Sequence, residues 1–130
     1  MTNSFESLTK ADLHLMADQL LKGDATGIES CVCYFEATTQ GLWHNRARAM
    51  MARRFKHCDL TVAQQQRLAS CILDRLAKGA AGEQFRDQLK LGLHLDALRF
   101  FGAATVLSKD PRSYVRKLAE WILNHETEKR

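Results

Sequence analysis

The stretch that decides the fold is 110-DPRSYVRKLAEWIL-123, near the end of the chain. Asp110 is a typical N-cap residue, and Pro111 suits the first helical position, where the backbone needs no amide donor. The apolar residues that follow recur every three or four positions and share one helical face: Tyr114, Leu118, Trp121 and Ile122. The stretch therefore predicts an amphipathic helix that packs on the helix before it.

The rest of the chain also carries signals for the starts and ends of helices. Pro111 is the only proline, and no segment alternates β-branched with polar residues, so helices are the main way to satisfy the backbone. Helix starts and stops are marked by two capping-box pairs and two glycines: Thr9 with Asp12, Thr61 with Gln64, Gly23 and Gly79. We expect an all-α chain of about seven short antiparallel helices. A weak break at 94-HLDAL-98 leaves residues 83–107 as either one helix or two.

The helix predicted to start near Gly41 carries most of the basic residues. If Trp43, Ala47, Met50 and Met51 form its buried centre, then Arg46 and Arg53 lie on one flank and Arg48 on the other, with Lys56 pointing away. Arg54 falls within the apolar stripe itself. We expect its aliphatic stem to cover apolar neighbours while the guanidinium reaches water or a carboxylate such as Asp74; the alternative is that it lines a groove.

Three segments repeat a pattern of a small or apolar residue, an arginine and then apolar residues: ARAMMARRF, FRDQLKLGL and VRKLAEWIL, with the arginines 38 and then 30 residues apart. With 110-DPRSYVRKLAEWIL-123, they give the chain a resemblance to the HEAT and armadillo class of α-helical repeats over residues 41–126. The two earlier units lack the proline and aspartate of the class. The resemblance implies a right-handed α-α superhelix that serves as a binding scaffold, and an irregular helical bundle is the alternative.

Length and composition fit one ordinary globular domain. The 130 residues, 45% hydrophobic and 26% charged, predict a single domain over 1–130, with an N-terminal tail at 1–8 and a frayed C-terminus at 127–130. The first residues show no basic leader followed by an apolar run, and no segment has about 18 consecutive apolar residues. We expect a cytoplasmic protein that does not enter a membrane and keeps its cysteines reduced.

No motif for catalysis or metal binding stands out. The sequence has no nucleophile elbow, no glycine-rich phosphate loop and no paired acidic motif on one helix face. The four cysteines match no zinc-ligand spacing, and the histidines are scattered: Cys31, Cys33, Cys58 and Cys71, and positions 14, 44, 57, 94 and 125. We expect no enzyme, no cofactor and no metal.

Charge is unevenly distributed along the chain. Residues 1–40 hold two basic and six acidic side chains, whereas residues 41–79 hold eight basic and two acidic ones. Two hypotheses follow: an interaction module that holds a protein partner or a second copy in a helical groove, and, as the alternative, a nucleic-acid-binding domain that uses the basic segment 41–79. The candidate binding residues are the same for both: Arg46, Arg48, Arg53, Arg54, Lys56, Arg86 and Lys90. We favour the protein partner.

Overall fold

A computed structural model of the protein describes residues 3–80 and 83–128. This part of the chain is helical, with one short 3-10 helix and six α-helices: η1 (Asn3–Ser7), α1 (Lys10–Lys22), α2 (Ala25–Glu36), α3 (Leu42–Phe55), α4 (Val62–Ala77), α5 (Glu83–Leu107) and α6 (Ser113–Glu128). The all-α class is confirmed. The predicted count of seven helices was wrong for the described residues, because the chain bends inside α5 instead of ending a helix there. Residues 3–7 of the predicted tail form η1.

The bend in α5 lies at Asp96, within the stretch where the sequence marks a weak break. Asp96 leaves helical geometry, with φ −156° and ψ 75°, and its Oδ1 accepts a hydrogen bond from the Arg99 amide at 3.4 Å. The second half of α5, residues 97–107, therefore begins with a cap of its own. Gly92 fits the bend, because a Cβ there would come within 2.1 Å of the buried Phe100 ring.

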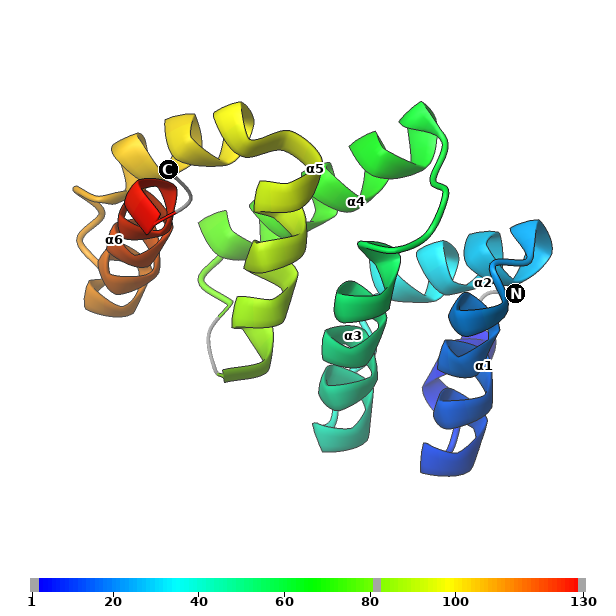
Figure 1. Ribbon diagram of the computed structural model, residues 1–130. Helices are drawn as coiled ribbons and strands as arrows, with labels where there is room; N and C mark the ends of the chain where they lie inside the picture. Colours follow the sequence, from blue (N-terminus) through cyan, green and yellow to red (C-terminus); the bar gives the residue numbers. More distant parts are fainter. Residues whose placement is uncertain (1–2, 81–82, 129–130) are drawn as a thin grey trace.

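The helices stand in two rows (Figure 1). In the first row, α3 packs between α1 and the first half of α5, and α6 packs against α5. The second row consists of α2, α4 and the second half of α5, with α4 in contact with both α2 and α5. A helix inside a row touches neighbours on both sides, so it buries its flanks as well as its centre.

This arrangement explains which residues predicted to be buried are buried in the structure and which are exposed. Leu118 and Ile122 of α6 are buried as predicted, but Tyr114 is 45% exposed and Val115 is buried in its place. Trp43, predicted at the buried centre of α3, is 42% exposed because it lies in the first turn of the helix. Ala47 and Met51 of that centre are buried, and so is the flank that carries Arg48, whereas Arg46 and Arg53 on the other flank are exposed.

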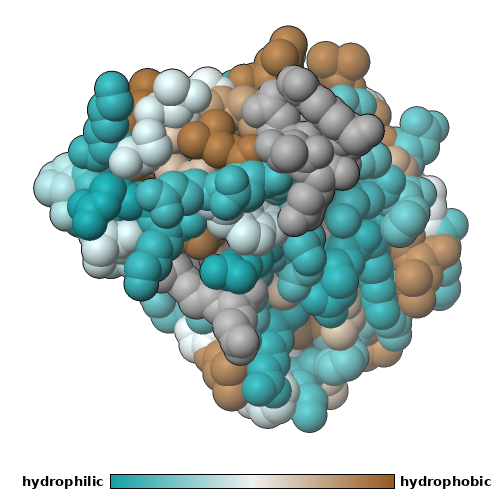
Figure 2. Space-filling view, turned by 60° about the vertical axis from the view of Figure 1, so that its left-hand side comes forward, coloured by the Kyte–Doolittle hydropathy of each residue, from teal (hydrophilic) through white to brown (hydrophobic). Residues whose placement is uncertain are grey.

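Three of the predicted helix ends are confirmed, whereas the predicted start of the last helix was wrong: α6 begins at Ser113 and not at Pro111, and Asp110 Oδ1 accepts from the Arg112 amide at 2.9 Å. Thr9 and Thr61 each form a capping box, and Gly23 ends α1 in the left-handed conformation with φ 70°. Viewed from the side of α6, the surface is mainly hydrophilic, with hydrophobic residues gathered along its upper edge (Figure 2). None of the helices in the described residues has the length and apolar character needed to span a membrane.

Candidate functional site

The predicted basic residues do not share one surface. Arg46 and Arg53 line a shallow groove of about 300 Å³ between α3 and α5, together with Met50 and Asp87. Arg53 donates to Asp87 at 2.9 Å, which neutralises part of its charge. Arg86 and Lys90 are exposed one turn apart on α5, and the Arg86 guanidinium lies 5.9 Å from the centre of the Trp121 ring.

A second pocket lies between α1 and α3, on the other side of Arg46. It has a volume of about 280 Å³ and is lined by Lys10, Leu13, His14, Trp43, Arg46, Ala47 and Met50. The Lys10 ammonium is 4.2 Å and the Arg46 guanidinium 5.1 Å from the centre of the Trp43 ring. The half-exposed indole therefore makes cation–π contacts with two cations.

The two pockets form one surface, because Arg46 and Met50 line both of them. We call this surface the aromatic-basic face and define it by Lys10, Trp43, Arg46, Met50 and Arg53. It crosses the first row of helices from α1 to α5. Its one acidic lining residue is Asp87, which is paired with Arg53.

The other predicted residues lie away from this face. Arg54 donates to Asp18 of α1 at 3.1 Å, so its carboxylate partner is not Asp74. Lys56 is the half-buried residue that ends α3. Arg48, predicted on the flank opposite Arg46 and Arg53, is only 4% exposed and points into a polar network at the carboxyl end of α2.

That network satisfies the backbone where α2 ends. Arg48 Nη2 donates to Ala37 O at 3.0 Å and to Thr39 O at 2.8 Å, and Arg48 Nη1 donates to Asn45 Oδ1 at 3.4 Å. Arg48 Nη2 also donates to the Thr39 hydroxyl, which lies 2.9 Å from His44 Nδ1. Tyr34 closes the chain of contacts with its hydroxyl 2.7 Å from the same nitrogen. The Arg48 guanidinium thus supplies hydrogen-bond donors to carbonyl groups at the end of α2, where no further helical turn supplies them.

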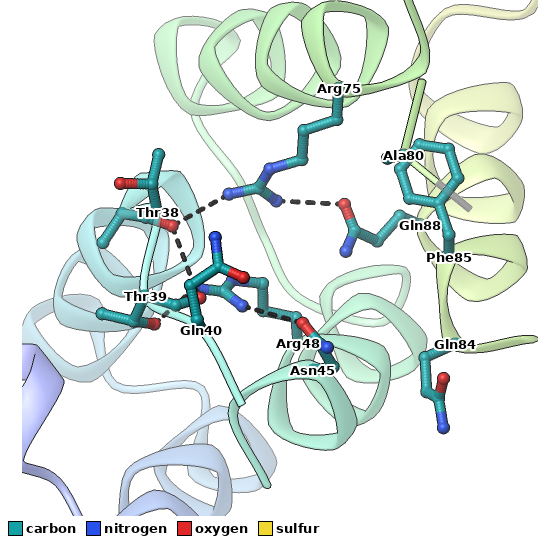
Figure 3. Close-up of a pocket in the computed structure, with 11 residues that line it drawn as sticks. Thr38, Thr39, Gln40, Asn45, Arg48, Arg75, Ala80, Gln84, Phe85 and Gln88 are labelled. Carbon is teal, nitrogen blue, oxygen red and sulfur yellow. Dashed lines mark hydrogen bonds between the residues drawn. The ribbon is translucent and has the colours of Figure 1, made fainter. Parts of the chain in front are cut away.

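A second arginine approaches the same helix end from α4. Arg75 Nη2 donates to Phe35 O and, at 3.1 Å, to Ala37 O, so it shares the Ala37 oxygen with Arg48. Arg75 Nη1 donates to Gln88 Oε1 of α5 at 3.0 Å. Around these groups lies a cavity of about 250 Å³, here called the polar pocket, which Figure 3 shows. Its lining residues are Ala37, Thr38, Thr39, Gln40, Asn45, Arg48, Arg75, Ala80, Gln84, Phe85 and Gln88.

The polar pocket is positively charged. Neither Arg48 nor Arg75 has an ion pair among the described side chains, and the lining includes no acidic residue. Burial lowers the pKa of the Arg48 guanidinium, and the positive charge of Arg75 acts in the same direction. The lining also holds no side chain that titrates near neutral pH. The pocket offers hydrogen-bond donors and charge, which suit binding.

Sequence reasoning missed Arg75 and Gln88, although a signal for them exists. Arg75 follows Leu68 by seven and Ile72 by three positions, so it lies on the apolar stripe of α4. Gln88 lies three positions after the buried Phe85 in the same way. A polar residue in phase with a buried stripe needs partners inside the fold, and these two meet each other.

Comparison of the chain with protein-family models, with curated proteins and with solved structures finds no match. In the described residues, no three His, Cys, Asp or Glu side chains come together as metal ligands would.

Proposed function

We propose that the chain is a non-catalytic interaction module of the helical-repeat type, and that it binds an acidic segment of a protein partner on the aromatic-basic face. The observation that carries the proposal is Trp43, which is 42% exposed, lines a preformed pocket and makes cation–π contacts with both Lys10 and Arg46. Tryptophan and arginine are the residues that most often dominate protein interfaces.

A HEAT-type or armadillo-type arrangement is part of this proposal. The pairing of helices in sequence order, and the packing of α1, α3 and α5 as neighbours in one row, are features that such repeats share. In a repeat of this kind, one row of helices presents a continuous surface to an extended ligand. The aromatic-basic face crosses three neighbouring helices and fits that use.

The positive charge of the aromatic-basic face favours a negatively charged partner. Lys10 and Arg46 have no carboxylate partner among the described side chains, and Arg53 shares its charge with Asp87. An acidic segment with one bulky apolar residue would complement both properties, with the apolar side chain in the α1–α3 pocket and carboxylates beside Lys10 and Arg46. Nucleic acid is less well matched, because Arg48 and Arg54 of the basic segment are engaged elsewhere.

The test is a fluorescence-anisotropy titration with a labelled peptide that alternates glutamate with leucine and phenylalanine. Trp43→Ala and Arg46→Glu should each weaken binding at least about tenfold, which corresponds to about 1.4 kcal/mol. Lys109→Glu is the matched control, because it makes the same change of charge as Arg46→Glu at an exposed position in the loop before α6. Equal affinity in all four proteins would contradict the proposal.

The same titration with duplex and single-stranded oligonucleotides examines the alternative. On duplex DNA, the logarithm of affinity should fall with the logarithm of salt concentration by about 0.9 for each phosphate contact. Sub-micromolar oligonucleotide binding at about 0.15 M salt, where the Debye length is about 8 Å, together with its loss in Arg46→Glu, would replace a protein partner with nucleic acid.

A further inference from the structure

The polar pocket holds donors that have no acceptor. Because arginine has only donors, the bond from Arg75 requires that the oxygen of the Gln88 amide face the guanidinium. The Gln88 nitrogen must then point the other way, as Figure 3 shows. Gln88 is only 6% exposed, and no described residue accepts a hydrogen bond from this nitrogen. The side chain of Gln88 is largely buried, and its amide donor is directed into the cavity.

Asn45 is oriented by the same rule on the opposite wall. Its Oδ1 accepts from Arg48 Nη1, so its amide nitrogen is also left as a donor. Arg75 uses only part of its donor set on Phe35 O, Ala37 O and Gln88. The buried Nε of Arg48 has no partner in the described chain. Gln88, Asn45 and Arg75 thus present donors on three walls of the pocket, whereas the buried Nε of Arg48 is closed to a ligand. A ligand of this pocket must bring acceptors.

The charge balance points to a negatively charged ligand. The carboxyl end of α2 contributes roughly half a negative elementary charge from its carbonyl groups. Two guanidinium groups converge on that end, because Arg48 and Arg75 both donate to Ala37 O. A positive charge larger than that of a single cation is left over at the pocket, with no described carboxylate beside it.

We infer that the polar pocket is a binding site for a small organic carboxylate, held by Arg75 and Gln88 directly, with Asn45 on the far wall. Arg48 is a positioning residue, because most of its hydrogen bonds hold other lining residues of the pocket in place: Ala37, Thr39 and Asn45. The volume of about 250 Å³ lies below the range of drug-sized pockets, so the ligand is compact. Phe85 supplies one apolar wall for a short carbon chain.

A carboxylate suits this donor set better than a phosphate. A phosphate ion concentrates up to two negative charges on one centre, and it is usually bound by several free guanidinium or backbone donors that converge on that centre. Here most N–H groups of Arg48 are already used by backbone carbonyls. The inference does not depend on the proposed function, since the aromatic-basic face is lined by other residues, apart from Gln84 at the edge of both cavities.

The probe is succinate, titrated into the isotopically labelled protein by NMR, with succinamide as an uncharged analogue and inorganic phosphate as a second anion. Succinate should shift the side-chain amide signals of Gln88 in a saturable way, and succinamide should not. Succinate should also bind more tightly than phosphate. An absence of saturable shifts up to about 10 mM succinate, equal binding of succinamide, or tighter binding of phosphate would each overturn the inference.

Two variants that supply their own carboxylate make the test specific. Gln88→Glu places a carboxylate next to Arg75, so it should keep the fold and weaken succinate binding at least tenfold. Asn45→Asp makes the same change at the exposed opposite wall and keeps the oxygen that accepts from Arg48. Gln66→Glu, on the exposed side of α4, is the matched control and should bind succinate as the wild type does. Wild-type affinity in both pocket variants would contradict the site.

Discussion

Two arginines of α4 reach across to α2 and meet different partners there. Arg67 lies between two carboxylates, 2.9 Å from Glu29 and 2.7 Å from Glu36. Arg75, two turns further along α4, meets the backbone oxygens of Phe35 and Ala37, next to a second arginine, Arg48. At the first contact, carboxylates compensate the positive charge of the arginine. At the second contact, the partners are neutral carbonyl groups, so the positive charge of the two arginines is not compensated and some of their N–H donors stay unused. Arg67 therefore joins two helices, and Arg75 both joins them and lines the polar pocket.

The largest expected effect comes from breaking the second contact at Arg48. Arg48→Met keeps the length of the side chain but removes the donors to Ala37 O, Thr39 O and the Thr39 hydroxyl. We expect a loss of about 3 kcal/mol in the free energy of unfolding, because buried acceptors are left without donors. Urea denaturation measures this loss.

Arg48→Lys is the informative companion variant. It retains the positive charge, but a single ammonium cannot reproduce the fork of a guanidinium, so its stability should be closer to that of the Met variant than to the wild type. A loss below about 1 kcal/mol in Arg48→Met would mean that water replaces the guanidinium at the helix end, and the account of this network would be wrong.

A smaller effect is expected at Arg67, although it has more carboxylate partners. Its side chain is 34% exposed and those of Glu29 and Glu36 are 46% and 35% exposed, so water screens both ion pairs. Arg67→Met should cost about 1 kcal/mol in urea denaturation. If it costs as much as Arg48→Met, the distinction between the two kinds of contact does not hold.

The smallest effect is a pH dependence that the Arg67 contact has and the Arg75 contact, which includes no carboxylate, lacks. The hydrogen bond from Gln64, and then that from Arg67, lower the pKa of Glu29 from 4.5 to about 2. Because the folded-state pKa is the lower one, the stabilisation is complete above about pH 4.5 and is lost as the pH falls toward 2.

Glu29→Gln should therefore flatten the fall of thermal stability in acid, by less than about 1 kcal/mol because the pair is exposed. Glu120→Gln, which removes an exposed carboxylate of α6 without a described ion pair, is the control and should follow the wild type. An acid transition in Glu29→Gln as steep as that of the wild type would show that this carboxylate is not coupled to folding.

The parts of this fold that depend on neighbouring residues could be predicted from the sequence. The capping boxes at Thr9 and Thr61 and the break near Asp96 each involve contacts within three residues, so their signals are local. The burial of Leu118 and Ile122 follows from one helical face meeting one neighbour.

The candidate sites depend on which helices become neighbours, and that information is not local. Arg75 reaches the end of α2 across 38 positions of sequence, and the exposure of Trp43 depends on how far α1 covers the first turn of α3. Arg48, a candidate binding residue on a flank of α3, is buried because α3 has neighbours on both sides. The positions of Arg75 and Gln88 on apolar stripes mark them as polar residues that need partners inside the fold, but they do not reveal what surrounds them.

One NMR spectrum, recorded with side-chain signals of arginine, glutamine and tryptophan, tests the central claim that cations without carboxylate partners mark the binding surfaces. The account predicts that succinate moves the Gln88 amide signals, that the acidic peptide moves the Trp43 indole signal, and that the Arg67 Nε–H signal moves with neither. If the Arg67 signal shifts on titration while those of Gln88 and Trp43 stay in place, the claim is contradicted.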